Sequence, residues 1–583
     1  MEVERSVLGR SWRLRACDEN AAHAISQRLG VPDVVGRLLA ARGIGVGDAG
    51  PFLAPRLRDW LPDPSHLKDL DRAAERLATA IGTGERIGLI GDYDVDGATA
   101  TALVARYLRS LGVAVELEIP DRLRDGYGPN ARLLSELAAR GCRLVVTLDA
   151  GTTAFEPLRL AAAAGLEVIV IDHHAAEGAM PEALGVVTPN RRDQESALKQ
   201  LAAVGVAFVV LVAVTRVLRA RGAFADRTEP PLLAWLDLVA LGTVCDVVQL
   251  QGLNRAFVRQ GLKVARSTAI PGLAALAEVA GLATIADARQ LGFVLGPRIN
   301  AGGRIGQSDL GARLLTTDSP EEAAALARRL HELNAERQAL ERRTLEAAAR
   351  AIEPQLEREL PVLLGAAEGW HPGIVGIAAS RLAERHHRPV VLLGVAEGIA
   401  KGSARSIRGF DLGAAVLEAR RQEILLQGGG HPMAAGITLA ASRTAELHEF
   451  LIARFVATVG AVPPPALLEL DAMISVGATR ANLVRQIDEL APYGAGNAEP
   501  CFCLTDARVI QARVVGDGHV SCTLAGAVDG RVRAIAFRAA GTALGPSLLD
   551  ARLPLRLAGR LRLEMWQGRE AACFEIDDAA SAA

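Results

Sequence analysis

The sequence has few of the features that mark membrane, secreted or base-stacking proteins. Aromatic residues make up only 4% of its 583 residues, so few rings are available to stack on bases. No apolar run is long enough to span a bilayer, and the charged N-terminus lacks the apolar stretch of a signal peptide. We therefore expect no membrane partner.

The cysteine content and the net charge exclude few further classes of protein. The seven cysteines are scattered without a CxxC pair, which indicates buried thiols in a reducing cytoplasm. The 65 Lys and Arg residues nearly balance 67 Asp and Glu residues, so net charge neither favours nor excludes nucleic-acid binding. Half of the residues are hydrophobic, and the chain is too long for one core. We expect two to four domains and a cytoplasmic location.

One group of acids follows an apolar run. Ile87–Ile90 predicts a buried strand, and Asp92, Asp94 and Asp96 come directly after it. In an extended segment Asp92 and Asp94 point the same way, because side chains alternate. Burying carboxylates without partners is costly, so the group indicates a bound cation or full solvent exposure. Gly97 is expected to turn the chain into the next helix.

The same arrangement recurs after two more predicted strands. Leu144–Leu148 precedes Asp149, and Val168–Ile171 precedes Asp172-His173-His174. Apolar strands that alternate with helices predict an α/β fold with a parallel sheet covered on both faces. Ligands bind at the carboxyl ends of the strands in such sheets. We therefore expect these clusters to converge, with Asp246 as a fourth member.

The combined clusters predict a metal centre. Carboxylates mixed with imidazoles suit Mn²⁺ or Mg²⁺, whereas zinc usually takes more Cys or His. Several ionised carboxylates at one point repel each other unless roughly two divalent cations neutralise them. Two such ions favour hydrolysis of a phosphate ester or anhydride. A helix N-cap or solvated turn is the simpler interpretation of any single acid, but the recurrence favours metals.

Three glycine-rich segments carry groups that suit phosphate oxygens. A surface salt bridge is the commoner role for each arginine taken alone, and His431 alone is explained by a turn cap. Two of the segments, Gly296–Gly306 and Gly428–Pro432, are predicted to be loops. The third segment is Gly402–Arg408. Their candidate substrate-binding residues are Arg298, Asn300, Arg304, Ser403, Arg405 and His431.

The pattern of elements predicts five segments. The second α/β unit begins near Pro361, and Pro463–Pro465 precedes alternating strands of a small barrel. A long charged helix with no role beyond that of a strut separates the α/β units. The predicted limits are 1–75 helical, 76–315 catalytic α/β, 316–355 connecting helix, 356–460 second α/β and 466–583 OB-like β-barrel.

The ordered motifs resemble the DHH phosphoesterase superfamily and, within it, the RecJ family of single-strand-specific exonucleases. The catalytic motifs it resembles are Asp92–Gly97, Asp149–Gly151, Asp172–His174 and Gly242–Asp246. The DHHA1 motifs it resembles are Gly369–Gly376, Gly402–Ser406 and Gly428–Gly436. Leu490–Pro500 is similar to the opening of the family's OB-type domain, so the resemblance covers most of the chain.

The resemblance implies two Mn²⁺ or Mg²⁺ ions per active site. The implied ligands are Asp92 and Asp149 for one ion, and Asp94, Asp149, His173 and Asp246 for the other. Asp172 and His174 are the implied catalytic residues: Asp172 would orient His173, and His174 would lie near the scissile phosphate. Asp96 is not an expected ligand. Related small phosphoesterases carry a His where Gly88 stands, which indicates that one metal is held more weakly.

The family implies an exonuclease that degrades single-stranded DNA from the 5′ end to mononucleotides, in recombination and repair. Arg298, Asn300, Arg304, Ser403, Arg405 and His431 would hold the 5′ end and its phosphates. A single-strand-binding protein and a helicase are partners implied by the family alone. Two alternatives stand beside this interpretation: a hydrolase of short oligonucleotides or nucleotide phosphates, and a non-catalytic DNA-binding scaffold.

Overall fold

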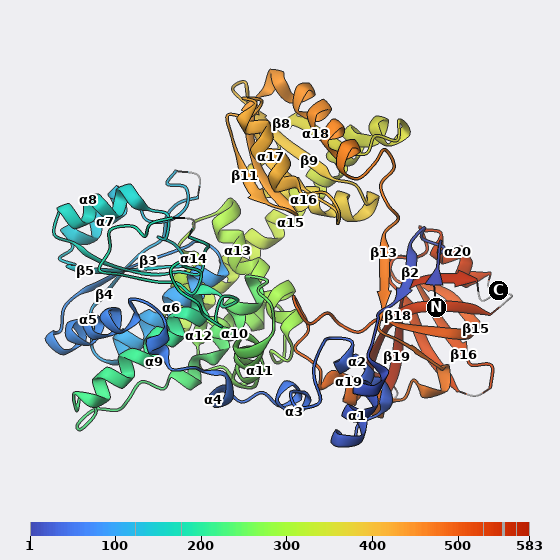
Figure 1. Cartoon of the computed structure of the whole chain (residues 1–583), viewed down its shortest axis with the longest axis horizontal. Helices are drawn as coiled ribbons and strands as arrows, with labels where there is room; N and C mark the ends of the chain where they lie inside the picture. The colour runs from blue at the N-terminus through green and yellow to red at the C-terminus, as the bar shows by residue number, and fades with distance from the viewer. Residues whose placement is uncertain are drawn as a thin grey trace. The chain divides into compact units, whose positions relative to one another are not determined.

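Five parallel strands form the sheet that positions the predicted metal ligands. The structure is a computed structural model. It describes residues 2–581 except for 123, 177, 529, 551–553 and 567. The chain divides into two compact units: residues 1–331 together with 467–583, and residues 332–466. Figure 1 shows the elements of both units.

The parallel sheet has the strand order β4-β3-β5-β6-β7. Its central strands β3 and β5 are buried throughout, as their unbroken apolar sequences require. Helices α7 and α8 cover one face, while α5, α6 and α9 lie on the other (Figure 1). The elements are α5 (Leu70–Thr83), β3 (Ile87–Gly91), α6 (Val95–Ser110), β4 (Val115–Glu118), α7 (Ala131–Ala139), β5 (Leu144–Leu148), α8 (Phe155–Ala163), β6 (Glu167–Ile171), β7 (Gly185–Val187) and α9 (Ala203–Ala220).

A series of helices follows the parallel sheet in the chain and completes this domain. Helix α9 is long and apolar enough to cross a membrane, but 72% of it is buried inside the unit, where it packs as a core helix. The elements that follow it are η2 (Leu232–Trp235), α10 (Leu236–Cys245), α11 (Gly252–Ala265), α12 (Pro271–Val279), η3 (Gln290–Leu295), α13 (Gly296–Ile305), α14 (Leu310–Thr316) and α15 (Pro320–Glu357). The unit boundary falls within α15.

Two local predictions in this domain are wrong. The segment Gly296–Gly306 is the helix α13 rather than a loop. Its glycines lower helix propensity, but they permit close packing: a Cβ at Gly303 would lie 2.9 Å from the carbonyl oxygen of Tyr93. Gly97 is not a turn residue either, since α6 already begins at Val95 and a Cβ on Gly97 would approach the Asp92 backbone to 2.5 Å.

The second unit is built on a five-stranded mixed sheet of order β11-β12-β10-β9-β8. Contrary to expectation, the glycine-rich segment around Gly428–Gly430 is an edge strand, not a loop, because its backbone pairs antiparallel with β12. The elements are β8 (Leu363–Glu368), α16 (Pro372–His386), β9 (Val390–Ala396), β10 (Ile399–Arg405), α17 (Leu412–Arg421), β11 (Gln427–His431), β12 (Ala434–Ala440), η4 (Ala441–Arg443) and α18 (Thr444–Thr458).

The C-terminal region is a closed barrel of order β14-β15-β16-β17-β19-β18, with an additional pairing of β15 to β18. The elements are β13 (Leu467–Leu470), β14 (Ala472–Ile474), η5 (Val476–Ala478), α19 (Ala481–Asp488), β15 (Phe502–Val515), β16 (His519–Ala525), β17 (Arg531–Ala536), α20 (Leu544–Leu549), β18 (Leu555–Trp566) and β19 (Arg569–Ser581). The predicted fold class, two α/β domains with a long helix and a C-terminal OB-like barrel, is confirmed.

The N-terminal residues pack against this barrel. Asp578 on β19 is fully buried and accepts hydrogen bonds from the Ser6 hydroxyl at 2.6 Å and the Trp12 indole at 3.2 Å. The elements there are β1 (Glu2–Val3), β2 (Ser11–Leu14), α1 (Glu19–Leu29), α2 (Asp33–Ala40), α3 (Ala49–Leu53), α4 (Leu57–Trp60) and η1 (Pro64–His66). The predicted all-helical N-terminal segment is therefore wrong for β1 and β2, which pair with each other, and β2 also pairs with β13.

Candidate metal centre

The structure brings the predicted ligands together at the carboxyl edge of the parallel sheet. The chain order reverses there between β3 and β5, which is the usual position for a ligand site in such sheets. Asp92 and Asp94 follow β3, Asp149 follows β5, and Asp246 ends α10. The groups whose ligand atoms lie within 4.8 Å of one another are Asp92-Asp94-Asp149, Asp149-His173-His174 and Asp96-His173-Asp246.

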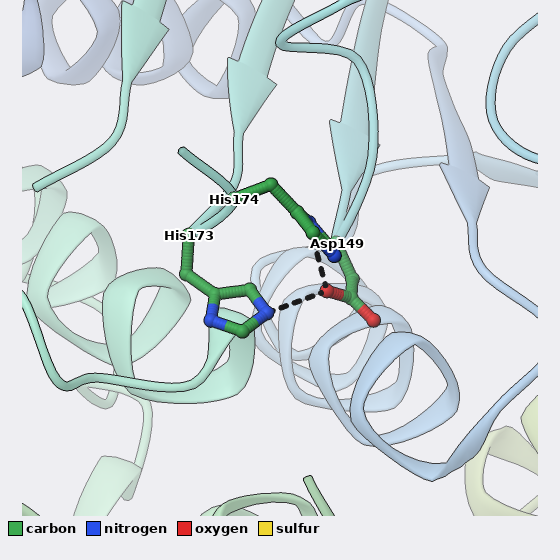
Figure 2. Close-up of side chains that lie close together, drawn as sticks. All are labelled: Asp149, His173 and His174. Atoms are coloured by element: carbon green, nitrogen blue, oxygen red, sulfur yellow. Dashed lines mark ion pairs between the residues drawn. The ribbon is translucent and has the colours of Figure 1, made fainter. Parts of the chain in front are cut away.

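Asp149 lies at the centre of the cluster. Its Oδ1 is 3.3 Å from His173 Nε2 and 3.9 Å from His174 Nδ1, and Figure 2 shows both imidazoles around this carboxylate. His173 Nε2 is also 3.6 Å from Asp246 Oδ2. The carboxylate of Asp149 is therefore placed to be shared between an Asp92-Asp94 side and a His173-Asp246 side.

The backbone at Asp149 is strained. Its φ of 62° is in the left-handed region that non-glycine residues rarely adopt, and such strain is typical of functional sites. The Asp149 amide donates to Ile171 O at 3.0 Å, and its carbonyl accepts from the Tyr127 hydroxyl at 2.7 Å. Hydrogen bonds on both sides thus hold this conformation.

The buried carboxylates lack partners that would compensate their charge. Within the described part of the chain, Oδ1 of Asp92, Oδ1 of Asp149 and Oδ2 of Asp246 are buried without any hydrogen bond. Burial, followed by the charge of Asp94, raises the pKa of Asp92 and of Asp246 to about 7 each. Burial and neighbouring acids likewise raise the pKa of Asp149 well above its usual range. A divalent cation would relieve both the desolvation and the repulsion.

The imidazole of His173 has the properties of a neutral ligand. Burial, followed by the charge of His174, lowers the pKa of His173 to about 4, so its ring is uncharged near pH 7. Oxygen ligands with one imidazole fit Mn²⁺ or Mg²⁺, and Mn²⁺ tolerates the nitrogen better. The residues at this site therefore fit the expected metal ions.

Asp172 contacts the other histidine, contrary to expectation. Its Oδ1 lies 2.7 Å from His174 Nδ1, and its Oδ2 accepts from the Thr152 hydroxyl at 2.7 Å. Toward His173 it accepts only the backbone N–H, at 2.7 Å. Asp172 therefore orients the His174 ring and the turn, not the His173 ring.

Asp96 is a buried anchor rather than a group that faces the cavity. It is 1% exposed, and its carboxylate accepts from the backbone N–H groups of Ala203 at 2.6 Å and Val204 at 3.0 Å. These are the first residues of α9, where the helix dipole favours a negative charge. Its Oδ2 lies 3.9 Å from His173 Nε2, so Asp96 fixes α9 beside the predicted metal ligands.

A cavity of about 350 Å³ opens over the cluster. Asn300 and Arg304 line it because residues four apart share one face of α13. Arg298 does not: its guanidinium donates to Val294 O at 2.6 Å and to His331 Nδ1 at 3.3 Å. The lining residues are Asp92, Tyr93, Asp94, Arg122, Tyr127, Asp149, His174, Cys245, Asp246, Asn300, Gly303 and Arg304.

Some of these lining residues were not predicted as site residues, notably Tyr93, Arg122 and Tyr127. The Tyr127 hydroxyl lies 3.1 Å from His174 Nδ1, with the two rings edge to face. The Arg122 guanidinium lies 5.2 Å from the centre of the Tyr93 ring. Tyr127 had a usable signal, since it is one of only four tyrosines and stands between glycines shortly after a predicted strand. Arg122 stands in the same post-strand segment and had no distinctive signal.

The remaining candidates share one face of the sheet in the second unit. The register places Arg405, Ala434 and His431 opposite one another on β10, β12 and β11. Ser403 lies two residues before Arg405, and its hydroxyl accepts from the Arg405 guanidinium at 2.5 Å. Side chains opposite each other or two apart point the same way. Arg405, Ser403 and His431 therefore form one polar row.

Glycines leave this row open. A Cβ at Gly376 of α16 would lie 3.1 Å from Arg405 Nη2, so glycine there makes room for the guanidinium. Gly429 and Gly436 lie opposite Ser403 across the strands, and a Cβ on either would meet nothing within 4 Å. A flat, uncovered backbone beside Arg and Ser side chains suits the close approach of a phosphate backbone.

Family models match all three folded regions. They are the DHH family N-terminal domain over residues 86–243, the DHHA1 domain over 359–457 and the RecJ OB domain over 470–578. The fold and the acidic site together define a multidomain phosphoesterase of the DHH class.

Individual relatives narrow this class. The chain is 34% identical to the single-stranded-DNA-specific exonuclease RecJ of Bacillus subtilis over 98% of this chain and 70% of that protein. It is 35% identical to RecJ of Escherichia coli, over 94% and 96% of the two chains. The crystal structure of RecJ with Mn²⁺ from Thermus thermophilus matches with a TM-score of 0.80 at 32% identity, covering 97% of this chain and 79% of that one. The chain belongs to the RecJ family.

Proposed function

We propose that this chain is a single-stranded-DNA-specific exonuclease that degrades its substrate from the 5′ end to mononucleotides by metal-dependent hydrolysis. The observation that carries the proposal is the cluster of buried, uncompensated carboxylates with His173 at the carboxyl edge of the sheet. Membership of the RecJ family supplies the substrate class and the polarity. The reaction belongs to DNA recombination and repair.

Two Mn²⁺ or Mg²⁺ ions are the cofactors. We assign Asp92 and Asp149 to one ion, and Asp94, Asp149, His173 and Asp246 to the other. The 4.8 Å groupings join Asp149 to Asp92 and Asp94 and, separately, to His173, and they join His173 to Asp246. Such a pair of ions supplies a nucleophilic water at neutral pH and stabilises charge at the phosphorus. The carboxylates would hold the two ions at this edge of the sheet. Asp94 has a second task, because its side chain also caps α6 by accepting from Gly97 N–H at 3.1 Å.

His174 is the proposed proton donor or hydrogen-bond donor at the phosphate. Burial alone would lower its pKa, but the hydrogen bond and charge of Asp172 outweigh burial, so the pKa of His174 is raised. The ring is held between Asp172 and the Tyr127 hydroxyl and lines the cavity. A cationic imidazole in that position offers an N–H to a phosphate oxygen or to the leaving oxygen.

Cationic and amide groups are proposed to hold the DNA backbone. In the cavity these are Asn300, Arg304 and Arg122. In the second unit they are Ser403, Arg405 and His431, which share the open sheet face. Burial lowers the pKa of Arg405, but the guanidinium stays charged and is free of any acidic partner within the described residues. Arg298 on α13 hydrogen-bonds to Val294 and His331 and does not line the cavity.

Further partners and the location follow from the family. We propose a single-strand-binding protein and a helicase as partners that supply or expose the single strand. The proposed location is the cytoplasm.

Digestion of a long single-stranded DNA labelled at its 5′ end tests the proposal. We expect immediate release of labelled mononucleotide with Mn²⁺ or Mg²⁺, and none in EDTA. Burying the 5′ end in duplex should block release. Label that stays on progressively shorter fragments would mean the opposite polarity, and activity confined to di- and trinucleotides would instead support a small-substrate hydrolase.

A further inference from the structure

The chain takes a strained path directly after Asp246. Asp246 follows the last residue of α10, and residues 247–251, which we call the Asp246 connection, join it to α11. Val247 has a φ of 60°, in the left-handed region, where a β-branched residue is a clear outlier. Its side chain is 70% exposed, so packing of that side chain does not stabilise the conformation. Such strain persists only where the surrounding structure holds it, so contacts elsewhere in the connection must do so.

A loop at the start of the C-terminal barrel domain holds the Asp246 connection. We call residues 490–498, which precede β15, the barrel entry loop; both segments belong to the same compact unit. The Leu250 amide donates to Ala495 O at 2.7 Å, and the Gln251 side-chain amide donates to Gly496 O at 3.2 Å. These hydrogen bonds fix the connection four and five residues after Asp246.

Glycines allow the two segments to approach closely. A Cβ at Gly496 would lie 3.0 Å from Gln249 Cβ, and a Cβ at Gly494 would lie 2.8 Å from Leu250 Cδ1. Real Cβ atoms rarely come so near without a shift of their neighbours, because protein interiors are close-packed. The barrel entry loop therefore lies against the Asp246 connection at a distance that only bare backbone permits.

The barrel entry loop is itself fixed in place. Asn497 is 2% exposed, and its side-chain amide donates to Leu490 O and to Pro492 O at 2.8 Å each. Arg255 of α11 is 1% exposed and donates to Ala491 O at 2.9 Å. The loop is thus closed on itself and bound to the helix into which the Asp246 connection leads, so it can act as a rigid support.

We infer that the barrel entry loop is a positioning element of the metal centre: by holding the Asp246 connection, it keeps Val247 in its strained conformation and the Asp246 carboxylate beside His173. Asp246 Oδ2 lies 3.6 Å from His173 Nε2, inside the cluster that fits a metal ion. The inference rests on the proposed function, which makes Asp246 a ligand. It gives residues of the barrel domain a part in metal affinity, although the described residues of the loop do not line the cavity.

Binding of Mn²⁺ to the full-length protein, measured by calorimetry without DNA, tests the inference. Gly496→Ala strains a φ of 71° and adds a Cβ that presses on Gln249. We expect Kd for Mn²⁺ to rise about 10- to 100-fold, as when a residue that supports a metal ligand is lost. Gly518→Ala is the matched control, because Gly518 has a φ of 82° in the turn between β15 and β16, where a Cβ would meet only Ala540, at 3.9 Å. It should lower Tm to a similar degree and leave Kd for Mn²⁺ unchanged.

Two further variants separate positioning from damage to the fold. Gln251→Ala removes the hydrogen bond to Gly496 without adding an atom, and should raise Kd for Mn²⁺ about 2- to 10-fold. Val247→Gly removes the strain, because glycine adopts the left-handed region readily. Combined with Gly496→Ala, it should bind Mn²⁺ about 5-fold more tightly than Gly496→Ala alone. Dinucleotide cleavage that is lost in Gly496→Ala should return at saturating Mn²⁺.

Unchanged Mn²⁺ affinity in both Gly496→Ala and Gln251→Ala would overturn the inference, as would an equal loss of affinity in Gly518→Ala. A loss in Gly496→Ala that neither Val247→Gly nor saturating Mn²⁺ reverses would also overturn it, because the loop would then support only the fold. Asp246→Asn tests the proposed function separately. If that variant binds Mn²⁺ like the unmodified protein, Asp246 is not a ligand, and the metal assignment fails whatever the loop variants show.

Discussion

The two sheets of the α/β domains carry functional groups of opposite charge, one at the ends of its strands and the other on its face. The parallel sheet gathers acids at the ends of its strands, where Asp92, Asp149 and His173 meet. The sheet of the second unit instead presents Ser403, Arg405 and bare glycine backbone on its face. Strand ends concentrate side chains at one point, which suits small cations, whereas a sheet face spreads them along a line, which suits a polymer of phosphates. The comparison predicts that damage to the first sheet lowers turnover and damage to the second weakens substrate binding.

The largest expected effect is that of Asp149→Asn. This change removes the charge shared by both metal groupings while keeping the side-chain size. Metal ions contribute several kcal/mol to such a transition state, so we expect kcat to fall by about 10³-fold or more. Single-turnover cleavage with Mn²⁺ measures this, and anisotropy should show nearly unchanged DNA binding. Normal turnover would refute the assignment of Asp149 as a ligand.

The matched change in the other sheet is Arg405→Ala. Hydrogen bonds to charged groups contribute about 1.5–3 kcal/mol, so we expect KM to rise about 10- to 150-fold with little change in kcat. Arg421→Ala is the control, because that side chain is 79% exposed on α17. Equal effects of the two variants would mean that the polar row is not a binding surface. A fall in kcat alone would break the contrast between the sheets.

Asp172→Asn tests whether the outer part of the metal centre acts through His174. With its amide oxygen toward Thr152, the Asn side chain keeps those contacts. It loses the charge that raises the pKa of His174 and the acceptor for the backbone N–H groups of His173 and His174. Removing such a supporting carboxylate typically costs about 10- to 100-fold in activity. We expect a lower kcat at unchanged Mn²⁺ affinity, since Asp172 does not contact the His173 ring. A large loss of metal affinity would instead place Asp172 behind a ligand.

Proton release on metal binding tests the buried acids. Asp92 and Asp246 have pKa values near 7, above the unfolded value of about 4, so the metal-free protein loses stability as pH rises through this interval. Both carboxylates are proposed ligands and bind metal only when ionised, so apparent Mn²⁺ affinity should fall as pH is lowered below about 7. Calorimetry in two buffers of different ionisation enthalpy measures the protons released. Asp246→Asn should release fewer, and an affinity independent of pH would contradict the interpretation.

The convergence of the proposed metal ligands was predictable because its signal is local. Apolar strands such as Leu144–Leu148 end directly in an acid, and parallel pairing alone then places those acids at one edge. The family resemblance assigned Asp172 to the wrong ring, because the direction of a turn side chain depends on the fold: here Asp172 contacts His174. The helix α13 was missed for a similar reason. Its glycines oppose helix formation locally, and only packing against Tyr93 explains them.

The helix α13, which was predicted as a loop, also explains why the sequence could not tell which of its candidate residues line the cavity. Arg298, Asn300 and Arg304 are equivalent in a loop, but on α13 only the pair four residues apart lines the cavity. Tyr127 and Arg122 reach the site from the segment after β4, at a distance that no periodicity reveals. The sequence therefore predicts residues whose position follows from strand pairing, and misses those whose position follows from packing.

The smallest expected effect sharpens the contrast between open and filled backbone within one sheet. A Cβ at Gly436 meets nothing within 4 Å, so Gly436→Ala should leave Tm nearly unchanged. A Cβ at Gly430 would lie 2.3 Å from Ala434 O, so Gly430→Ala should lower Tm by several degrees. If phosphates approach the bare strand, Gly436→Ala should raise KM a few-fold although the fold is intact. Thermal unfolding and steady-state kinetics of the pair decide this, because an unaltered KM would mean that the open glycine serves the sheet and not the DNA.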